Sequence, residues 1–518
     1  MRRLPSKYVF GSALSLMVVV AFFVRCLPLL LPNGAQKPAR FDEGVYLSAA
    51  RLFFEGQMPY QDFVVLHPPG HLLLLWPLTS LADDLGGWTE VLLVVRWLSA
   101  LVGVGNVLLL VSVVSRWRGR HAGLVAGALY AAYRPAIEVE GQVMLEPFVV
   151  LLVLLGAHAW LPRSPGVTPR RAMTAGALIA GAGLVKLTGG LAMVALLLSP
   201  PGRGQRFRGL WSIAGATMIS AVVLVPFAVA VGPSRVWDQV VLAQAARPGG
   251  DLEGGSIPDV QHRLLAAGRF GVFGADVIPD TVVWLLLLLV ALAAFWALVR
   301  GGREGRFWAT SLVVLLGAPL FAPDYYDQYS VPAAVPMSAL LAALSADAIA
   351  RLSRVSWVAG SALTIGVSTV LIAGLADVTR DAWLVKPTTS VDFGAKVQAV
   401  VGERDCIFSD PPGLALAADR LPPRDRSGSF LIDPFGALLV ESLHQHVPGT
   451  TPDVLKAPPA QARLKTALSA CPYVALNALP SRNGRMSAET AEWFERRFRP
   501  VPSASTSYGV LWQVRDRG

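Results

Sequence analysis

Two adjacent acidic residues, Asp42 and Glu43, follow the first long apolar run of the chain, and a polar loop with His67 in front of two prolines comes next. A carboxylate can take a proton from an attacking hydroxyl, and a histidine can stabilise an anionic leaving group. Two neighbouring acids repel each other unless a substrate, a cation or an arginine shares their field. The pattern therefore predicts an active-site loop. Alternatively, Asp42 only caps a following helix, which would account for one of the two acids.

Composition places this loop in a membrane protein. Of the 518 residues, 53% are hydrophobic and 15% are charged. The mean hydropathy of +0.51 exceeds what the core of a water-soluble protein can hide. A membrane-spanning helix needs about 20 mostly apolar residues. Apolar runs lie near 8–31, 91–115, 121–137, 147–162, 172–199, 210–232, 281–299, 306–322, 331–350 and 356–376.

The net charge of +10 reflects membrane topology rather than nucleic-acid binding, because the arginines lie in short loops instead of on one basic face. By the positive-inside rule, the basic loops and the amino terminus are expected to be cytoplasmic. No small-residue cleavage pattern is evident after the first run, so we expect it to be an uncleaved anchor. The basic loops contain Arg116, Arg118, Arg120, Arg163, Arg170, Arg171, Arg203, Arg206, Arg208, Arg300, Arg303, Arg306, Arg351 and Arg354. The loops between them are external and contain Asp42, Glu43, Glu138, Glu140, Glu146, the 233–280 segment, Asp324 and Asp327.

The 172–199 run has basic residues on both flanks, so the chain is expected to enter and leave on the same side, as two spans or as a re-entrant hairpin. The turn is expected near Lys186, the one lysine between Lys37 and Lys386. A charge at this depth costs about 2.5–3.5 kcal/mol on insertion scales, which favours a functional partner such as a phosphate. The alternative is a lysine that only reaches to the interface. Counting the hairpin as two, we expect about eleven membrane segments and an external carboxyl end.

Two domains are expected, because the apolar runs end near residue 376. A membrane domain over 1–376 would carry the external catalytic loop 32–90, and a soluble external domain would occupy 377–518. Strand-like and helix-like pieces alternate in the second domain, which predicts a small α/β layer. Cys406 and Cys471 both lie in it and could form a disulfide. The chain contains no phosphate-cradling GxxxxGK[ST] loop, so nothing supports ATP-driven transport.

The order of these features resembles the polytopic GT-C glycosyltransferases, in particular the family-39-like branch of protein O-mannosyltransferases and aminoarabinose transferases. Members start with a span, an external loop with an acidic pair, an interfacial helix and an [HK]PP element. The matching features here are Asp42-Glu43, the amphipathic segment from Val45 to Glu55, and His67-Pro68-Pro69. Looser matches are Glu146 before Pro147, the Gly183-Leu184-Val185-Lys186-Leu187-Thr188 element and Gln328-Tyr329-Ser330-Val331-Pro332. The resemblance implies an all-α polytopic membrane domain of the GT-C type, with the small external α/β domain appended.

This resemblance also implies a function, the transfer of a sugar from a polyprenyl-phosphate donor at the outer surface of the lipid bilayer. The external acceptor could be a lipid, a glycan or a protein. Sugar transfer passes through an oxocarbenium-like transition state, and an inverting enzyme needs a carboxylate that deprotonates the acceptor hydroxyl. We assign that role to Asp42, with Glu43 beside it. The leaving phosphate needs cationic or hydrogen-bonding partners, for which His67 and Lys186 are the candidates and Arg134 a helper.

Three acids of one external loop compete for a second acidic site, Glu146 first and Glu138 or Glu140 otherwise. Glu43 and Glu146 could bind sugar hydroxyls or hold a divalent cation, the one cofactor that the sequence leaves open. A candidate sugar pocket, or alternatively an interfacial aromatic belt, is formed by Tyr326, Asp327, Gln328 and Tyr329.

Two other classes of protein are compatible with a polytopic chain. A transporter or lipid flippase usually has its site near the midplane, between internal repeats with broken helices. Here the acids lie in outer loops and no repeat is visible, so only the Lys186 hairpin favours this class. A non-catalytic scaffold of the cell envelope would explain the external domain but not the acidic loop.

Overall fold

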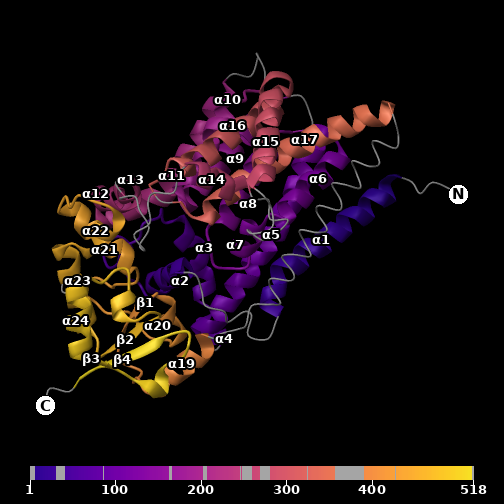
Figure 1. Ribbon diagram of the computed structural model, residues 1–518. Helices are drawn as coiled ribbons and strands as arrows, with labels where there is room; N and C mark the ends of the chain where they lie inside the picture. The colour runs from indigo at the N-terminus through magenta and orange to yellow at the C-terminus, as the bar shows by residue number, and fades with distance from the viewer. Residues whose placement is uncertain are drawn as a thin grey trace.

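The computed structural model describes residues 6–30, 41–85, 87–162, 166–201, 207–245, 247, 260–268, 280–323, 325–355, 390–425 and 428–515 (Figure 1). The expected span at 356–376 and the start of the second domain up to residue 389 lie outside the described residues.

Helices make up almost all of the membrane domain. The long ones are α1 (Ser6–Leu30), α5 (Trp88–Arg118), α6 (Arg120–Ala131), α8 (Glu146–Trp160), α9 (Pro169–Val185), α11 (Arg208–Val231), α15 (Asp280–Arg300), α16 (Gly302–Leu320) and α17 (Val331–Val355). Within the described residues, four helical stretches are long and apolar enough to cross a membrane: Trp88–Arg118, Arg208–Val231, Asp280–Arg300 and Asp327–Ile349. The predicted helical membrane domain is confirmed in its fold.

Small residues allow these helices to approach closely. A Cβ atom on Gly176 of α9 would clash with the carbonyl of Ser212 on α11, and one on Gly215 of α11 would clash with the carbonyl of Met173. The α9–α11 crossing is therefore built on two glycines, as is common where helices pack without a hydrophobic driving force between them. The main core lies between α5, α6, α8, α9 and α17.

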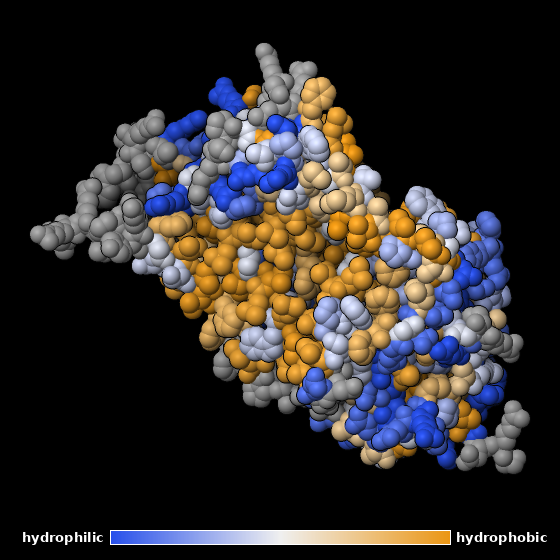
Figure 2. All heavy atoms as spheres, turned by 180° about the vertical axis from the view of Figure 1, so that it is seen from behind, coloured by the Kyte–Doolittle hydropathy of each residue, from blue (hydrophilic) through white to orange (hydrophobic). Residues whose placement is uncertain are grey.

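The surface of the membrane domain carries a broad hydrophobic belt between two polar ends (Figure 2). Large apolar side chains on α11 and α15 stay exposed, as expected for surfaces that face lipid. They include Leu210, Trp211, Met218, Val222, Val225, Val229, Leu285, Leu288, Leu292 and Phe295.

Residues in or next to the loops that were predicted to be cytoplasmic lie together at one end of the bundle. Arg116 contacts the ring of His158 through a 2.7 Å hydrogen bond. The indole of Trp160 donates to the Ser199 carbonyl at 3.2 Å, and the Arg303 guanidinium donates to the Trp160 carbonyl. The acid-containing loops lie at the opposite end, beside the second domain (Figure 1).

The 172–199 run reverses direction at Lys186, as predicted. Helix α9 ends at Val185, Lys186 is extended (φ −150°, ψ 125°), and a 3-10 helix η2 (Leu187–Leu191) leads into α10 (Ala192–Leu198). Gly183 and Gly190 contact each other across the turn. Ser199 returns to Trp160, at the end of the bundle where α9 begins. The two arms of the hairpin therefore start and finish at the same end.

The second domain is a small α/β unit, again as predicted. Four strands, β1 (Ile407–Asp410), β2 (Tyr473–Leu476), β3 (Phe498–Pro500) and β4 (Val510–Val514), form a sheet in the order β1-β2-β4-β3. The β1–β2 pair is parallel and the other two pairs are antiparallel. The helices are α19 (Ser390–Gln398), α20 (Gly413–Ala417), α21 (Pro434–His444), α22 (Thr451–Lys456), α23 (Pro458–Ala470) and α24 (Ala488–Arg497). A disulfide joins Cys406 to Cys471, a pairing that the sequence left open.

The second domain packs directly on the loop that was expected to be catalytic. Helix α2 (Phe41–Phe54) approaches α20 so closely that a Cβ on Gly44 would clash with the backbone of Gly413. The Phe430 amide donates to the Asp62 carbonyl at 2.6 Å. Leu66 packs into the core of the second domain beside Phe435. The two domains therefore share one interface, and α2 lies in it.

Candidate active site

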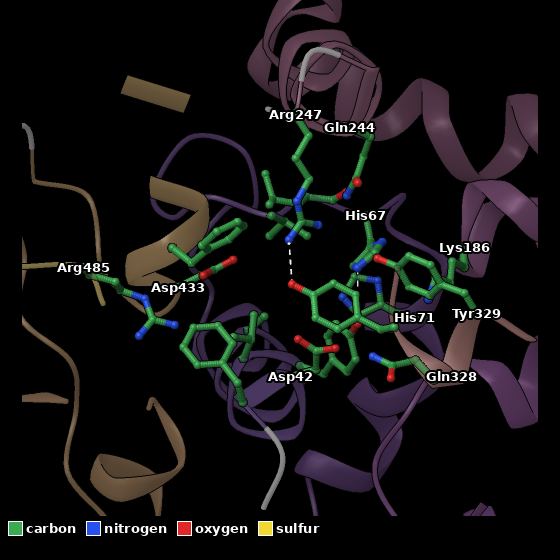
Figure 3. Close-up of a pocket in the computed structure, with 18 residues that line it drawn as sticks. Asp42, His67, His71, Lys186, Gln244, Arg247, Gln328, Tyr329, Asp433 and Arg485 are labelled. Atoms are coloured by element: carbon green, nitrogen blue, oxygen red, sulfur yellow. Dashed lines mark hydrogen bonds between the residues drawn. The ribbon is translucent and has the colours of Figure 1, made fainter. Parts of the chain in front are cut away.

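A cavity of about 310 Å³ lies at the interface between the membrane domain and the second domain (Figure 3). The membrane domain contributes five parts of the chain to its walls: α2, the loop that leads to α3 (Gly70–Thr79), the turn at Lys186, the segment with Gln244 and Arg247, and the 326–329 segment. The second domain closes it with Asp433, Phe435 and Arg485. Six residues predicted from the sequence line this cavity: Asp42, His67, Lys186, Tyr326, Gln328 and Tyr329.

Asp42 and Glu43 lie in the first turn of α2 and point in different directions. Asp42 borders the cavity near its centre (Figure 3). Glu43 is fully buried and binds Arg96 of α5 through two hydrogen bonds of 3.0 and 2.8 Å, and it accepts a third from the Val143 amide at 2.7 Å. The structure therefore places one acid of the pair at the cavity and the other in a buried ion pair.

His67 is held from both sides by tyrosines. Its ring nitrogen Nε2 lies 3.2 Å from the hydroxyl of Tyr46, and its carbonyl accepts a hydrogen bond of 2.9 Å from the hydroxyl of Tyr60. Burial, together with the nearby charges of Lys186 and Arg247, lowers the pKa of His67 well below its ordinary value. The ring is consequently neutral at physiological pH, so it can offer hydrogen bonds but no positive charge.

His67 and Lys186 meet because the two loops that carry them pack backbone to backbone. Gly70, at the start of α3, lies against the end of α9, where a Cβ atom would be 2.5 Å from the Leu184 carbonyl oxygen. Only a glycine fits at such a contact. The turn that follows Pro68-Pro69 thus fixes the distance between the external loop and the Lys186 turn.

Lys186 has an acidic partner and an aromatic one. Its ammonium lies 2.5 Å from Glu146 at the start of α8 and 4.4 Å from the centre of the Tyr329 ring. Glu146 is 1% exposed, and one of its carboxylate oxygens has no hydrogen-bond partner among the described residues. Glu146 therefore does not line the cavity itself. It contacts Lys186, which does, and forms a buried ion pair with it.

The remaining predicted residues lie away from the cavity. Arg134 pairs with Glu138 at 2.9 Å on a partly exposed turn of α7 (Arg134–Glu140). Glu140 is buried against Arg25 at 2.6 Å and also accepts hydrogen bonds from Tyr130 and Asn106. Asp327 begins a 3-10 helix, η5 (Asp327–Ser330). The residues on either side of it, Tyr326 and Gln328, line the cavity, but Asp327 does not.

No cation site is visible in the described part of the chain. Among the described residues, no three His, Cys, Asp or Glu side chains lie close enough together to hold a metal ion. Glu43 and Glu146, the two acids considered for this role, bind Arg96 and Lys186 instead. These residues do not fit a divalent cation, because each carboxylate already neutralises a basic side chain.

Arg247 is a cavity residue that sequence reasoning missed. It follows a short helical region formed by α12 (Pro233–Trp237), the π-helix η4 (Asp238–Leu242) and α13 (Ala243–Ala245). Its guanidinium lies 3.2 Å from the Tyr326 hydroxyl and 4.7 Å from the centre of the Phe435 ring. Gln239 bonds the Tyr60 carbonyl and the Val65 amide, which ties this region to the loop before His67.

The second domain supplies further cavity residues that were missed. Asp433 accepts a 2.8 Å hydrogen bond from the Gly436 amide at the start of α21. Burial, and to a smaller extent the charge of Asp42, raises the pKa of Asp433 to about 6. Arg485 binds both carboxylate oxygens of Asp410 at 2.7 Å and lies 4.7 Å from the Phe41 ring centre. Asp433 directly follows the apolar Phe430-Leu431-Ile432 run. A polar residue after such a run is the one sequence feature that could have identified Asp433 as a candidate site residue.

Several solved structures have this architecture. ArnT from Cupriavidus metallidurans bound to undecaprenyl phosphate matches with a TM-score of 0.60 and 14% identity, over 97% of this chain and 98% of that one. The apo oligosaccharyltransferase of Archaeoglobus fulgidus matches with a TM-score of 0.58 and 11% identity, over 91% of this chain and 70% of that one. AglB from the same organism, in complex with an inhibitory peptide and a dolichol-phosphate, matches with a TM-score of 0.54 and 11% identity, over 98% and 74%. No curated protein sequence matches the chain.

These likenesses define the fold class, the GT-C type of polytopic membrane glycosyltransferase. The model of glycosyltransferase family 87 matches residues 65–323, and the chain belongs to that family. The predicted GT-C class is thus confirmed, and the family whose model matches is family 87. Membership in a glycosyltransferase family leaves the transporter and scaffold alternatives without support.

Proposed function

We propose that the protein transfers a sugar from a polyprenyl-phosphate donor to an acceptor hydroxyl in the interface cavity, with inversion and with Asp42 as the general base. The observation that carries the proposal is the meeting of Asp42 with Lys186 and Arg247 in one cavity. A carboxylate opposite two cations is what an inverting transfer with a phosphate leaving group requires.

An apolar groove beside the cavity supports a lipid-linked donor. It has a volume of about 510 Å³ and runs between α9, η2, α11 and the 233–241 segment. Pro68 and Leu187 line it, and each is the direct neighbour of a cavity residue, His67 or Lys186. A prenyl chain in this groove would leave its phosphate beside His67 and Lys186. ArnT, a protein of the same fold, binds undecaprenyl phosphate.

The proposed reaction has one step. The acceptor oxygen attacks the anomeric carbon from the face opposite the phosphate, while Asp42 takes the hydroxyl proton. A new bond forms between the anomeric carbon and the acceptor oxygen as the bond to the phosphate oxygen breaks. The phosphate leaves with the bonding electrons and is stabilised by Lys186 and Arg247. Neutral His67, whose Nε2 lies beside the Tyr46 hydroxyl, donates its one ring N–H to a phosphate oxygen.

The proposed site faces the outer side of the membrane. Arg116 and Arg303, which belong to the basic loops, lie at the end of the bundle away from the cavity, and the positive-inside rule assigns that end to the cytoplasm. The second domain carries the Cys406–Cys471 disulfide, a bond that persists in oxidising compartments outside the cytoplasm. Both observations support an external cavity and an external second domain.

The test of this function is donor consumption by the purified protein. A panel of polyprenyl-phosphate sugars is incubated with the wild type, with Asp42→Asn and with Glu55→Gln, a control carboxylate just beyond the far end of α2 that pairs with Arg51. We expect Asp42→Asn to lower turnover by roughly 10²–10⁴-fold, the usual contribution of a general base, with the abundance of the protein unchanged. Near-normal turnover in this variant would exclude Asp42 as the base.

A further inference from the structure

Tyr46 is the one hydrogen-bond partner of the His67 ring among the described residues. Its hydroxyl lies 3.2 Å from Nε2 of the imidazole, and both side chains line the cavity. The other ring nitrogen, Nδ1, makes no hydrogen bond within the described part of the chain. Lys186 lies at the same end of the cavity as His67 (Figure 3). Nδ1 is therefore the ring atom that is left for the proposed donor phosphate.

The hydrogen bond between Tyr46 and His67 can run in two directions. Neutral His67 carries one ring N–H. Burial, and to a smaller extent the charge of Asp42, raises the pKa of the Tyr46 hydroxyl well above its ordinary value, so Tyr46 keeps its proton. Either Tyr46 donates to Nε2 and the ring hydrogen lies on Nδ1, or Nε2 donates to Tyr46 and Nδ1 carries a lone pair.

Burial of Tyr46 distinguishes the two directions. Tyr46 is 4% exposed, and a buried hydroxyl that donates to no acceptor is unfavourable. The acceptor within hydrogen-bond distance, among the residues that the structure describes, is Nε2 of His67. In the opposite direction the Tyr46 hydrogen would lack this acceptor, and Nδ1 would present a lone pair to an anionic phosphate. Both effects favour the ring with its hydrogen on Nδ1.

The turn around His67 holds the two side chains in this arrangement. The Tyr60 hydroxyl donates to the His67 carbonyl at 2.9 Å. Nδ1 of His71 lies 2.9 Å from the Pro68 carbonyl and donates to it, because a carbonyl oxygen only accepts. The Tyr46 ring packs edge-on against the rings of His67 and His71, with centroid distances of 5.6 and 5.5 Å. Tyr46 therefore cannot turn away from Nε2 without losing this packing.

From this geometry we propose that Tyr46 is a positioning residue that holds His67 as the Nδ1–H tautomer, so that Nδ1 donates to the donor phosphate and to the phosphate as it leaves. No bond to Tyr46 forms or breaks in the reaction. The inference rests on the proposed function and deepens it, since it names the residue that decides which ring nitrogen serves the phosphate. Asp42 lies four residues before Tyr46, on the same face of α2. One helix would thus position both the base and the phosphate ligand.

The direct test is the tautomer of His67, measured by solid-state NMR on the full chain in lipid bilayers with 15N-labelled histidine. The protonated and unprotonated nitrogens of a neutral imidazole have well-separated 15N shifts, and the signals of His67 are those absent from His67→Asn. We expect Nδ1 to carry the proton in the wild type and the Nε2–H form to increase in Tyr46→Phe. Tyr60→Phe is the matched control, because the Tyr60 hydroxyl bonds the His67 carbonyl and not the ring. It should keep the wild-type tautomer.

A kinetic arm measures whether Tyr46 acts through His67. The side-chain amide of asparagine places an N–H near the position of Nδ1 and has no tautomers, whereas that of glutamine reaches the position of Nε2. We expect Tyr46→Phe to lower kcat roughly tenfold to a hundredfold in the wild type, the value of a hydrogen bond to a charged group. The same change should cost less than twofold in His67→Asn, and His67→Gln should be less active than His67→Asn.

Three outcomes separate this inference from the proposed function. A wild-type ring with its proton on Nε2 would overturn the inference even if Tyr46→Phe did not fold. Equal losses from Tyr46→Phe in the wild type and in His67→Asn would mean that the two residues act independently, which also overturns it. In both cases donor consumption by the wild type would leave the proposed function intact. If the wild type consumes no polyprenyl-phosphate sugar, the proposed function fails and this inference fails with it.

Discussion

Asp42 and Glu43 are adjacent in sequence, but Asp42 borders the cavity while Glu43 is buried in an ion pair with Arg96. Successive residues of a helix point about 100° apart, so one turn can serve the site with one acid and the packing with the next. Glu43 also accepts the Val143 amide, three residues before Glu146. It therefore joins α2, α5 and the loop that leads to α8.

This difference predicts that loss of either acid abolishes activity, but that only loss of Glu43 lowers stability. Glu43→Gln removes the charge that neutralises Arg96, and breaking a buried pair on one side costs on the order of 3–5 kcal/mol. We expect a clear fall in the thermal unfolding temperature in detergent, together with lost activity. Asp42→Asn should lose activity at a wild-type unfolding temperature. A Glu43→Gln protein with wild-type stability and no activity would instead place Glu43 in the chemistry.

The pair of Lys186 and Glu146 allows stability to be separated from function. Lys186→Met leaves Glu146 charged and buried, so both stability and turnover should fall, the latter by roughly 10²–10³-fold as for loss of one oxyanion-stabilising group. In the double variant Lys186→Met/Glu146→Gln no buried charge is left alone. We expect its unfolding temperature to recover while its turnover does not.

The conservative replacement completes this test. Lys186→Arg keeps the positive charge beside Glu146, so it should be more active than Lys186→Met, although the larger guanidinium is not equivalent to an ammonium. Equal and full activity of both single variants would remove Lys186 from the donor site.

Sequence alone could locate the membrane-domain half of the cavity. Charge distribution put Asp42, His67 and Lys186 at one surface, and the apolar runs predicted the helical fold. The cysteine positions allowed a disulfide but did not decide it. The sequence could not predict where the side chains of Glu138, Glu140 and Glu146 point. All three belong to one loop, and the burial of each depends on which helices pack nearby. Arg247, Asp433 and Arg485 were also missed, since tertiary docking, not local pattern, brings distant segments to one cavity.

Substrate binding should depend on pH through Asp433, which borders the cavity. Burial and the Asp42 charge raise the pKa of Asp433 to about 6, although the Gly436 amide and the charges of Arg485 and Arg247 act in the opposite direction. Above that pH the side chain is a carboxylate that can accept hydrogen bonds from a bound substrate, and below it the side chain is protonated. We expect the KM of the substrate that contacts Asp433 to rise as the pH falls from 7 to 5, and this rise to be much reduced in Asp433→Asn. An identical pH profile of the KM in the variant would contradict the assignment.

The contact between Gly44 and Gly413 tests whether docking of the second domain is needed for activity. A Cβ on Gly44 would meet the backbone of Gly413 rather than a movable side chain, so Gly44→Ala must push α2 and α20 apart. Overpacking of this kind costs roughly 1–3 kcal/mol. Because α2 carries Asp42 and the second domain carries Asp433, we expect lower turnover and faster proteolysis between the domains. Gly105→Ala in α5 is the control, since no atom lies within 4 Å of the added carbon. Wild-type turnover in Gly44→Ala would mean that the cavity works without close contact between the two domains.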